Sequence, residues 1–254
     1  MVQKLTHIKG LCFDFDGVFY DLSAISDING LSDVIFAESA ISILGDKIDY
    51  HHAKEMARRS YQQYGASITA FTQWAEDNGL DKDSITNQIF HMYHQRMHDR
   101  LLHVAPHAFS PASHIKAAFE KCKGEIVNGI ATHGSIQNYA TPILDRKELL
   151  GYFSTQAMFG LNDADYNRKS ENTVLIQKCF NALNTPMSEG GFVEDSPSNL
   201  KVAKSYHPEL TTIYIHHGKP LENKPSHVDF QFHDVGELKN AIHTAKMESP
   251  IILL

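Results

Sequence analysis

The chain has 254 residues, of which 42% are hydrophobic and 21% charged, a composition typical of a globular protein with a substantial core and room for a second, smaller domain. Its formal net charge of −7 argues against a large nucleic-acid-binding surface. No apolar run approaches the length of a membrane span, and residues 1–9 lack the apolar stretch of a signal peptide. We therefore expect a cytoplasmic protein that binds neither nucleic acid nor a membrane, with Cys12, Cys122 and Cys179 buried and reduced.

The first predicted element is a short buried strand within 11–15, flanked by Gly10 and Gly17. A long block with helical periodicity follows, because apolar residues recur every three or four positions in 53–64, 68–75 and 85–97. Prolines at 106 and 111 mark the end of this helical block.

Strand and helix patterns alternate over the rest of the chain. The predicted strands are 126–131, which Asn128 and Gly129 weaken, then 192–193, 211–215 and 228–232; the predicted helices are 115–122, 174–183 and 238–242. Such alternation favours a parallel sheet covered on both faces. We therefore predict an α/β fold: a Rossmann-like parallel sheet core (1–18 and 105–254) with an inserted helical cap domain (19–104).

Two acidic pairs end predicted strands. Asp14 and Asp16 close the first strand, where the period of two places both carboxylates on one side and Gly17 lets the chain turn away. Glu194 and Asp195 close the strand at 192–193. Ligands bind beyond the carboxyl ends of strands in open parallel sheets, and paired carboxylates there suit a divalent cation, a nucleophile and an acid. A polar corner or a helix cap would explain one pair alone, but not the same arrangement at two strands.

Two further positions could contact phosphate. Residues 132–135, which include Thr132 and His133, follow a predicted strand and open a helix, so a hydroxyl and free N–H groups could form a phosphate cradle; an ordinary serine cap is the alternative. Pro142 is expected to shorten that helix. Lys169 precedes another helix, and a lone lysine is usually a solvated surface residue.

In chain order, these positions resemble the four sequence motifs of the haloacid dehalogenase superfamily. Asp14 and Asp16 match the first motif, Thr132 the second, Lys169 the third, and Glu194 with Asp195 the fourth. Two departures are present: His133 stands where asparagine is common, and Ser170 where proline is common. Neither departure removes a charged catalytic group, although His133 weakens any transfer of substrate from relatives.

The resemblance implies a magnesium-dependent phosphatase that acts through an aspartyl-phosphate intermediate. Asp14 would attack phosphorus, and Asp16 would protonate the leaving group and then activate water. Thr132, His133 and Lys169 would bind the phosphate oxygens.

The resemblance also implies the ligands of Mg²⁺. These would be Asp14, the backbone carbonyl of Asp16, and Asp195, with Glu194 binding directly or through water. Oxygen ligands of this kind suit a hard cation better than zinc.

Within the superfamily, the helical block is similar to the cap of pyrimidine 5′-nucleotidases, because residues 61–65 match the Tyr-x-x-Tyr-Gly of that group. This resemblance implies pyrimidine nucleoside 5′-monophosphates as substrates, with Tyr61 and Tyr64 near the base, unless both rings are cap core. One alternative is a phosphatase or phosphomutase for sugar or other small phosphate esters. Another is a non-catalytic member that binds a partner or phospho-ligand. The expected partner is in any case a small phosphorylated metabolite.

Two features stand apart from these motifs. His91, His94 and His98 share a predicted helix face, and His94 and His98 have the spacing of a helical zinc site, but a solvated face is the default because no HExxH glutamate follows. The apolar tail at 250–254 either docks on the core or joins a subunit contact.

Overall fold

The computed structural model describes residues 5–64, 67–166 and 168–248, without the side chain of residue 64; the apolar tail lies outside these residues. The chain divides into two compact units. The sheet unit comprises Met1–Asp21, Phe109–Thr132 and Leu144–Leu254, and the helical unit comprises Leu22–Ala108 and His133–Ile143. The predicted boundaries, 18/19 and 104/105, differ by a few residues, and the prediction left 133–143 in the core.

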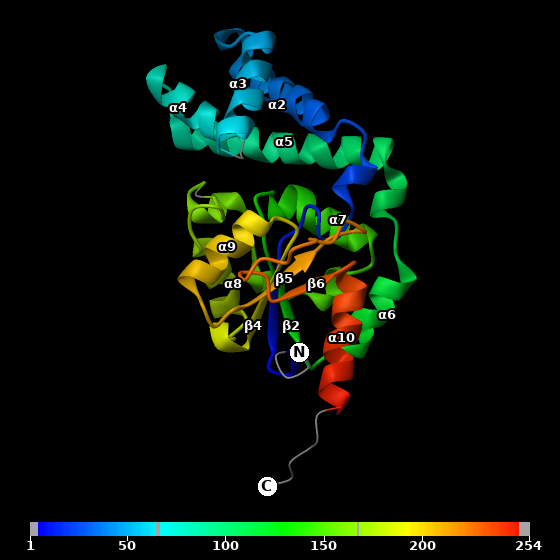
Figure 1. Cartoon of the computed structure of the whole chain (residues 1–254). Helices are drawn as coiled ribbons and strands as arrows, with labels where there is room; N and C mark the ends of the chain where they lie inside the picture. The colour runs from blue at the N-terminus through cyan, green and yellow to red at the C-terminus, as the bar shows by residue number, and fades with distance from the viewer. Residues whose placement is uncertain (1–4, 65–66, 167, 249–254) are drawn as a thin grey trace. The chain divides into compact units, whose positions relative to one another are not determined.

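The sheet unit is built on one parallel sheet (Figure 1). The strand order is β3-β2-β1-β4-β5-β6. The strands are β1 (Gly10–Phe13), β2 (Val127–Ala131), β3 (Met158–Phe159), β4 (Gly190–Glu194), β5 (Thr211–Ile215) and β6 (Phe230–Phe232). The short β3 was not predicted, because two residues carry no periodicity. The predicted fold class, a Rossmann-like parallel sheet with a helical insertion, is confirmed.

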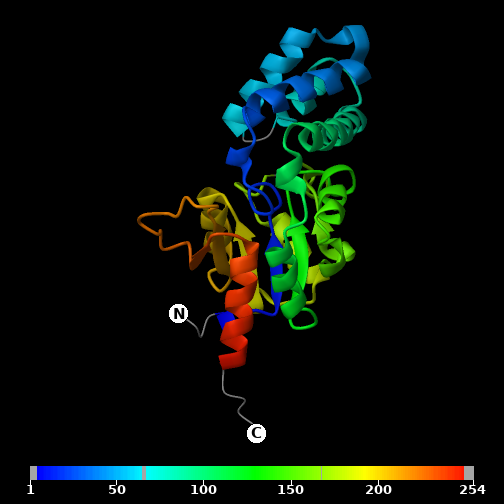
Figure 2. The ribbon, with the colours of Figure 1, turned by 90° about the vertical axis from the view of Figure 1, so that its right-hand side faces the viewer.

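Helices cover both faces of the sheet. They are α6 (Ser113–Lys121), α8 (Val174–Ala182), α9 (Pro197–Tyr206) and α10 (Val235–Glu248). Cys12 and Phe192 pack in one hydrophobic cluster with residues of α8 and α9. Phe13 points to the opposite face, where its ring lies 6.1 Å from that of Phe119 in α6. On that face α6 and α10 lie side by side (Figure 1, Figure 2).

The two residues that weaken the β2 pattern are explained by what they touch. A Cβ on Gly129 would lie 2.5 Å from both Ala157 O and Cys179 Sγ, so only glycine fits there. The buried Asn128 side chain donates to Tyr152 O at 2.8 Å and accepts from Lys239 Nζ at 2.6 Å. The strand therefore keeps its place through close packing and a satisfied polar contact.

The helical unit contains α2 (Ile28–Leu44), α3 (Tyr50–Tyr64), α4 (Thr69–Asp77), α5 (Lys82–Val104), a π-helical turn η4 (Ile136–Ala140) and α7, whose six residues (Thr141–Arg146) begin in this unit. Short 3-10 turns occur in both units: η1 (Leu22–Ala24), η2 (Gly45–Lys47), η3 (Pro106–Phe109), η5 (Leu150–Tyr152), η6 (Thr155–Ala157), η7 (Leu161–Ala164) and η8 (Met187–Glu189). Pro142 is the second residue of α7, which directly continues the π-helical turn η4, and its effect on the length of that helix stays a prediction.

One segment of the described residues, Ile28–Lys47, is long and apolar enough to cross a membrane by length and composition alone, with a mean hydropathy of 1.2. This corrects the expectation that no apolar run approaches a membrane span. The segment forms α2 and η2, and α2 packs on α3 and α5 with Ile35, Phe36 and Ala40 buried. Helices in the core of soluble proteins pass the same test, so this packing accounts for at least part of the apolar character.

The prediction that the histidines of α5 form a solvated helix face is wrong. His94 is buried; its Nδ1 lies 2.7 Å from Phe90 O, and its ring lies 5.6 Å from that of Tyr139. His91 Nδ1 lies 3.2 Å from Ser135 Oγ. These contacts explain why 133–143 groups with the helices. In the described part of the chain, the three histidines form no converging group of metal ligands.

Candidate active site

Three of the predicted residues lie at the carboxyl ends of adjacent strands. Asp14 directly follows the central strand β1, Thr132 follows β2, and Glu194 is the last residue of β4. Asp14 N donates to Val193 O at 2.8 Å, which continues the parallel pairing of β1 and β4 by one residue. The order of the strands therefore brings positions 118 and 180 residues from Asp14 to one edge of the sheet.

Lys169 is a buried lysine, contrary to the usual behaviour of a lone lysine. Its Nζ lies 2.5 Å from Asp14 Oδ1 and 3.0 Å from Glu194 Oε2, and only 2% of the residue is exposed. It comes from the loop before α8, in which Asp165 and Tyr166 have positive φ angles of 49° and 61°. That loop thus delivers one ammonium group to two carboxylates.

Glu194 is fully buried, and both of its carboxylate oxygens accept hydrogen bonds. Oε1 accepts from the backbone N–H groups of Asp195 and Ser196, each at 3.1 Å. Oε2 accepts from Lys169 Nζ at 3.0 Å and from Asn199 Nδ2 at 3.1 Å. Glu194 therefore orients Lys169 and the start of α9, and little of its carboxylate is left for another ligand.

Asp195 lies against the loop that follows Asp14. A Cβ on Gly17, whose φ is +73°, would lie 1.9 Å from Asp195 Oδ2, so the glycine is required both by its conformation and by this close approach. One ligand atom from each of Asp14, Glu194 and Asp195 lies within 4.8 Å of the others; among the described residues no other such group is found.

Burial and mutual repulsion govern the charges of this cluster. Burial, then the neighbouring Glu194, raises the pKa of Asp14 to about 7, although Lys169 opposes the rise. Burial, then Asp14, raises the pKa of Asp195 to about 6. Burial disfavours the Lys169 ammonium, but Asp14 and Glu194 outweigh it and raise its pKa. The cluster thus holds more carboxylates than one ammonium neutralises, and a divalent cation with oxygen ligands fits it.

Asp16 is half-buried and accepts a hydrogen bond through Oδ1 from the Tyr20 hydroxyl. Tyr20 is itself buried, with its ring 4.7 Å from that of Phe109. Sequence reasoning missed Tyr20, although a tyrosine four residues after an acid in a turn is within reach of its carboxylate. Asp16 is near enough to Asp195 to contribute to the raised pKa of that group.

The second motif is split between the two units. Thr132 is fully buried, and its N–H donates to Phe159 O of β3 at 3.0 Å. His133 is half-buried and belongs to the helical unit. A phosphate-binding role for Thr132 or His133 remains a prediction.

His217 is a second residue that sequence reasoning missed. Its Nε2 lies 2.9 Å from Gly17 O, although the two residues are separated by 200 positions. His217 follows β5. The sequence feature that could have indicated it is the polar run His-His-Gly directly after that predicted strand.

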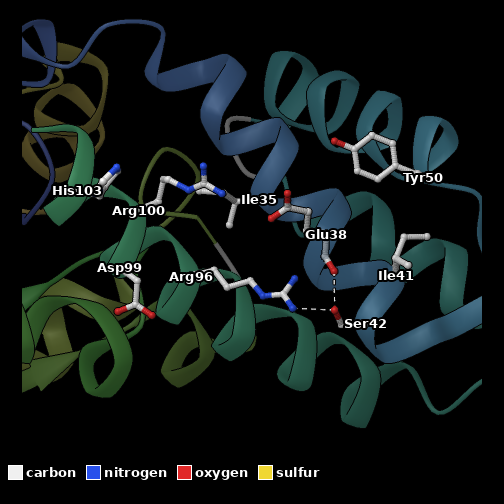
Figure 3. A pocket seen from close by; sticks show the side chains of 9 residues that line it. All are labelled: Ile35, Glu38, Ile41, Ser42, Tyr50, Arg96, Asp99, Arg100 and His103. Carbon is white, nitrogen blue, oxygen red and sulfur yellow. Dashed lines mark hydrogen bonds between the residues drawn. The ribbon is translucent and has the colours of Figure 1, made fainter.

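Two hollows lie within the helical unit, and each has side chains of both charges. The first, of about 670 Å³, contains Arg96 and Arg100 beside Glu38, and Arg96 Nη2 donates to Ser42 Oγ at 2.7 Å (Figure 3). The second, of about 900 Å³, is lined by Tyr61, which is 50% exposed and therefore not cap core. Tyr64 ends α3, but its side chain lies outside the described residues.

Comparison with known proteins gives a likeness of structure only. No protein-family model and no curated protein matches the sequence. A β-phosphoglucomutase from Clostridium difficile is 14% identical, with a TM-score of 0.58 over 95% of this chain and 98% of that one. A 2-haloacid dehalogenase from Pseudomonas syringae pv. Tomato DC3000 is 15% identical, with a TM-score of 0.55 over 93% and 99%. A HAD-superfamily hydrolase from Geobacter sulfurreducens PCA is 16% identical, with a TM-score of 0.51 over 93% and 97%. This chain therefore shares the fold of proteins from the haloacid dehalogenase superfamily. These proteins are named for different activities: a mutase, a dehalogenase and a hydrolase.

Proposed function

We propose that this chain is a phosphatase of the haloacid dehalogenase superfamily that transfers the phosphoryl group of a small phosphate ester to Asp14 and then to water. The observation that carries the proposal is the position of Asp14. It is buried at the end of the central strand, with Lys169 Nζ 2.5 Å from one oxygen and Asp195 beside it. A carboxylate held in this way suits nucleophilic attack, because its position is fixed and its charge is opposed by an ammonium.

In the first step an Asp14 oxygen forms a bond to phosphorus, and the bond from phosphorus to the leaving oxygen breaks. Asp16 donates its proton to that oxygen. In the second step Asp16 takes a proton from water, water attacks phosphorus, and the bond to Asp14 breaks. Tyr20, which donates to Asp16, orients the carboxyl for both steps. A dehalogenase needs no leaving-group acid, so Asp16 favours phosphoryl transfer.

The residues also fit the Mg²⁺ that phosphatases of this superfamily use. Asp14, Asp195 and the backbone carbonyl of Asp16 would hold the ion. When bound, it supplies positive charge that offsets the charge on the phosphoryl oxygens. Both oxygens of Glu194 already accept hydrogen bonds. We therefore propose that Glu194 orients the side chains of Lys169 and Asn199.

For the substrate we propose a pyrimidine nucleoside 5′-monophosphate. The exposed ring of Tyr61 and the hollow beside it leave an aromatic face for a base, with Lys54 and Arg58 in the same lining. For the location we propose the cytoplasm, because Cys12, Cys122 and Cys179 are free and buried.

The test is phosphate release from a panel of UMP, CMP, AMP, sugar phosphates and p-nitrophenyl phosphate, with Mg²⁺ and after exhaustive chelation. We expect release that requires Mg²⁺ and is best with the pyrimidine nucleotides. Release that survives chelation would contradict the metal assignment. A preference for sugar phosphates would favour the alternative substrate class, and no release from any ester would favour a non-catalytic protein.

A further inference from the structure

His217, in the turn after β5, contacts the loop that follows Asp14. Gly17 contributes its carbonyl, which lies 2.9 Å from His217 Nε2. Because a carbonyl oxygen accepts only, Nε2 carries the proton and donates. Both residues belong to the sheet unit, so this contact joins the loop after β1 to the turn after β5.

The same glycine fixes the place of Asp195. Its backbone packs so closely on that carboxylate that a Cβ would lie 2.3 Å from Asp195 Cγ. Movement of the Gly17 peptide therefore changes the distance between Asp195 and the Asp14–Asp16 loop. The loop's own hydrogen bonds, from Val18 N and Phe19 N to Phe15 O at 3.3 and 3.2 Å, turn the backbone but do not tie it to β5.

The turn that carries His217 is strained and anchored. The φ angle of His217 is +43°, a left-handed conformation that is unfavourable for a residue other than glycine. Its N–H donates to His233 O at 3.0 Å, and His216 N donates to Phe232 O at 3.1 Å, so the end of β6 holds the turn. Glycine would relieve the strain, and the presence of histidine instead points to a use for its side chain.

We infer that His217 is a positioning residue, which holds the Gly17 peptide so that Asp195 and Asp14 stay at the spacing required for one divalent cation. The contact on which this role depends is the one between His217 Nε2 and Gly17 O. The inference rests on the proposed function only for its effect on catalysis; the restraint on the loop is independent of it.

Three variants of the full chain separate this role from a structural one. His217→Gly removes the donor and relieves the positive φ, so the fold is preserved. His217→Gln removes the ring but keeps an N–H donor of similar reach. His107→Gln, an exposed histidine in η3, is the matched control.

The measurements are amide hydrogen exchange of residues 15–19, Mg²⁺ affinity by calorimetry, and turnover of p-nitrophenyl phosphate. For His217→Gly we expect faster exchange and about 3- to 10-fold weaker Mg²⁺ binding, the size of one neutral hydrogen bond. We expect kcat to fall at least about 10-fold, with KM changed less than about 3-fold, because misplacement acts on the reacting groups. His217→Gln should recover most of each loss, and His107→Gln should match the wild type.

If the His217 side chain does not restrain the Gly17 peptide, His217→Gly only relieves the positive φ, and exchange at 15–19 and Mg²⁺ affinity stay unchanged; that result overturns the inference. If the wild type neither binds Mg²⁺ nor releases phosphate, the proposed function is wrong. Hydrogen exchange alone then tests whether His217 restrains the loop. Faster exchange at 15–19 in His217→Gly then still supports the restraint, and unchanged exchange overturns it.

Discussion

At the scale of single residues, the site is a cluster of carboxylates held at a cost in stability. Asp14, Glu194 and Asp195 share one ammonium, that of Lys169, in a buried setting. These carboxylates must be in place before an anionic substrate and a cation bind. Their mutual repulsion therefore lowers the stability of the folded, unliganded protein.

We therefore predict that Asp14→Asn abolishes turnover but stabilises the metal-free protein at pH 8. The pKa of Asp14 rises from 3.8 to about 7 in the fold, so its contribution to stability is present below the unfolded pKa and is lost as pH rises through about 7. The neutral amide avoids that loss, and Lys169 keeps Glu194 at 3.0 Å. We expect a gain on the order of 1–3 kcal/mol in the free energy of unfolding.

Denaturant unfolding at pH 4 and pH 8 measures this gain, with the exposed Asp145→Asn as the control. The gain should be largest at pH 8 and nearly absent at pH 4. A variant that is less stable than the wild type at pH 8 would show that the ion pair with Lys169 outweighs the repulsion.

Residue types and strand context made Asp14, Glu194 and Asp195 predictable from the sequence, because acids at two strand ends have a pattern. Tyr20 and His217 could not be found that way. Their partners, a carboxylate four residues away and a carbonyl 200 residues away, are set by loop geometry that periodicity does not encode.

At the scale of elements, strands and helices with strong periodicity were predictable, and β5 matches its predicted range, Thr211–Ile215. The prediction failed where tertiary contacts decide. The three histidines of α5 looked like a polar face, but His94 is enclosed by the rings of Phe90, Tyr93 and Tyr139. Residues 133–143 group with the helical unit because η4 packs on α5.

The buried His94 predicts acid sensitivity of the helical unit. Burial lowers its pKa from 6.5 to about 4, so the stability it contributes is present above 6.5 and is lost as pH falls through 4. The full loss is about 3 kcal/mol, from the size of the pKa shift. In His94→Phe the free energy of unfolding should fall less between pH 6.5 and 4 than in the wild type.

Urea titrations across that range measure the difference, with the exposed His103→Gln on the same helix as control. If His94→Phe and the wild type lose stability in parallel, His94 does not titrate as a buried neutral group.

At the scale of the whole molecule, phosphoryl chemistry and substrate choice are assigned to different parts of the chain. The acidic cluster and Lys169 belong to the sheet unit, and Tyr61 belongs to the helical unit. The fold was predictable because alternating strands and helices have few arrangements. The substrate is not fixed by the fold, which other activities share.

We predict that UMP is hydrolysed with a higher kcat/KM than AMP, because the resemblance of residues 61–65 to the cap of pyrimidine 5′-nucleotidases implies a base site for a single ring. Tyr61→Ala should lower the ratio of the two specificity constants, since base stacking contributes about 1–3 kcal/mol per base. The exposed Tyr206→Ala in α9 should leave the ratio unchanged. A ratio near one in the wild type would argue against the nucleotidase assignment, and an unchanged ratio in Tyr61→Ala would remove Tyr61 from the base site.

In the proposed mechanism Asp14 carries the phosphoryl group. The most direct measurement is mass spectrometry of the protein quenched in acid during turnover of p-nitrophenyl phosphate with Mg²⁺. We predict one added phosphoryl group on the peptide that contains Asp14, more of it in Asp16→Asn, where hydrolysis lacks its base, and none in Asp14→Asn. A phosphoryl group on another residue, or phosphate release by Asp14→Asn at the wild-type rate, would contradict it.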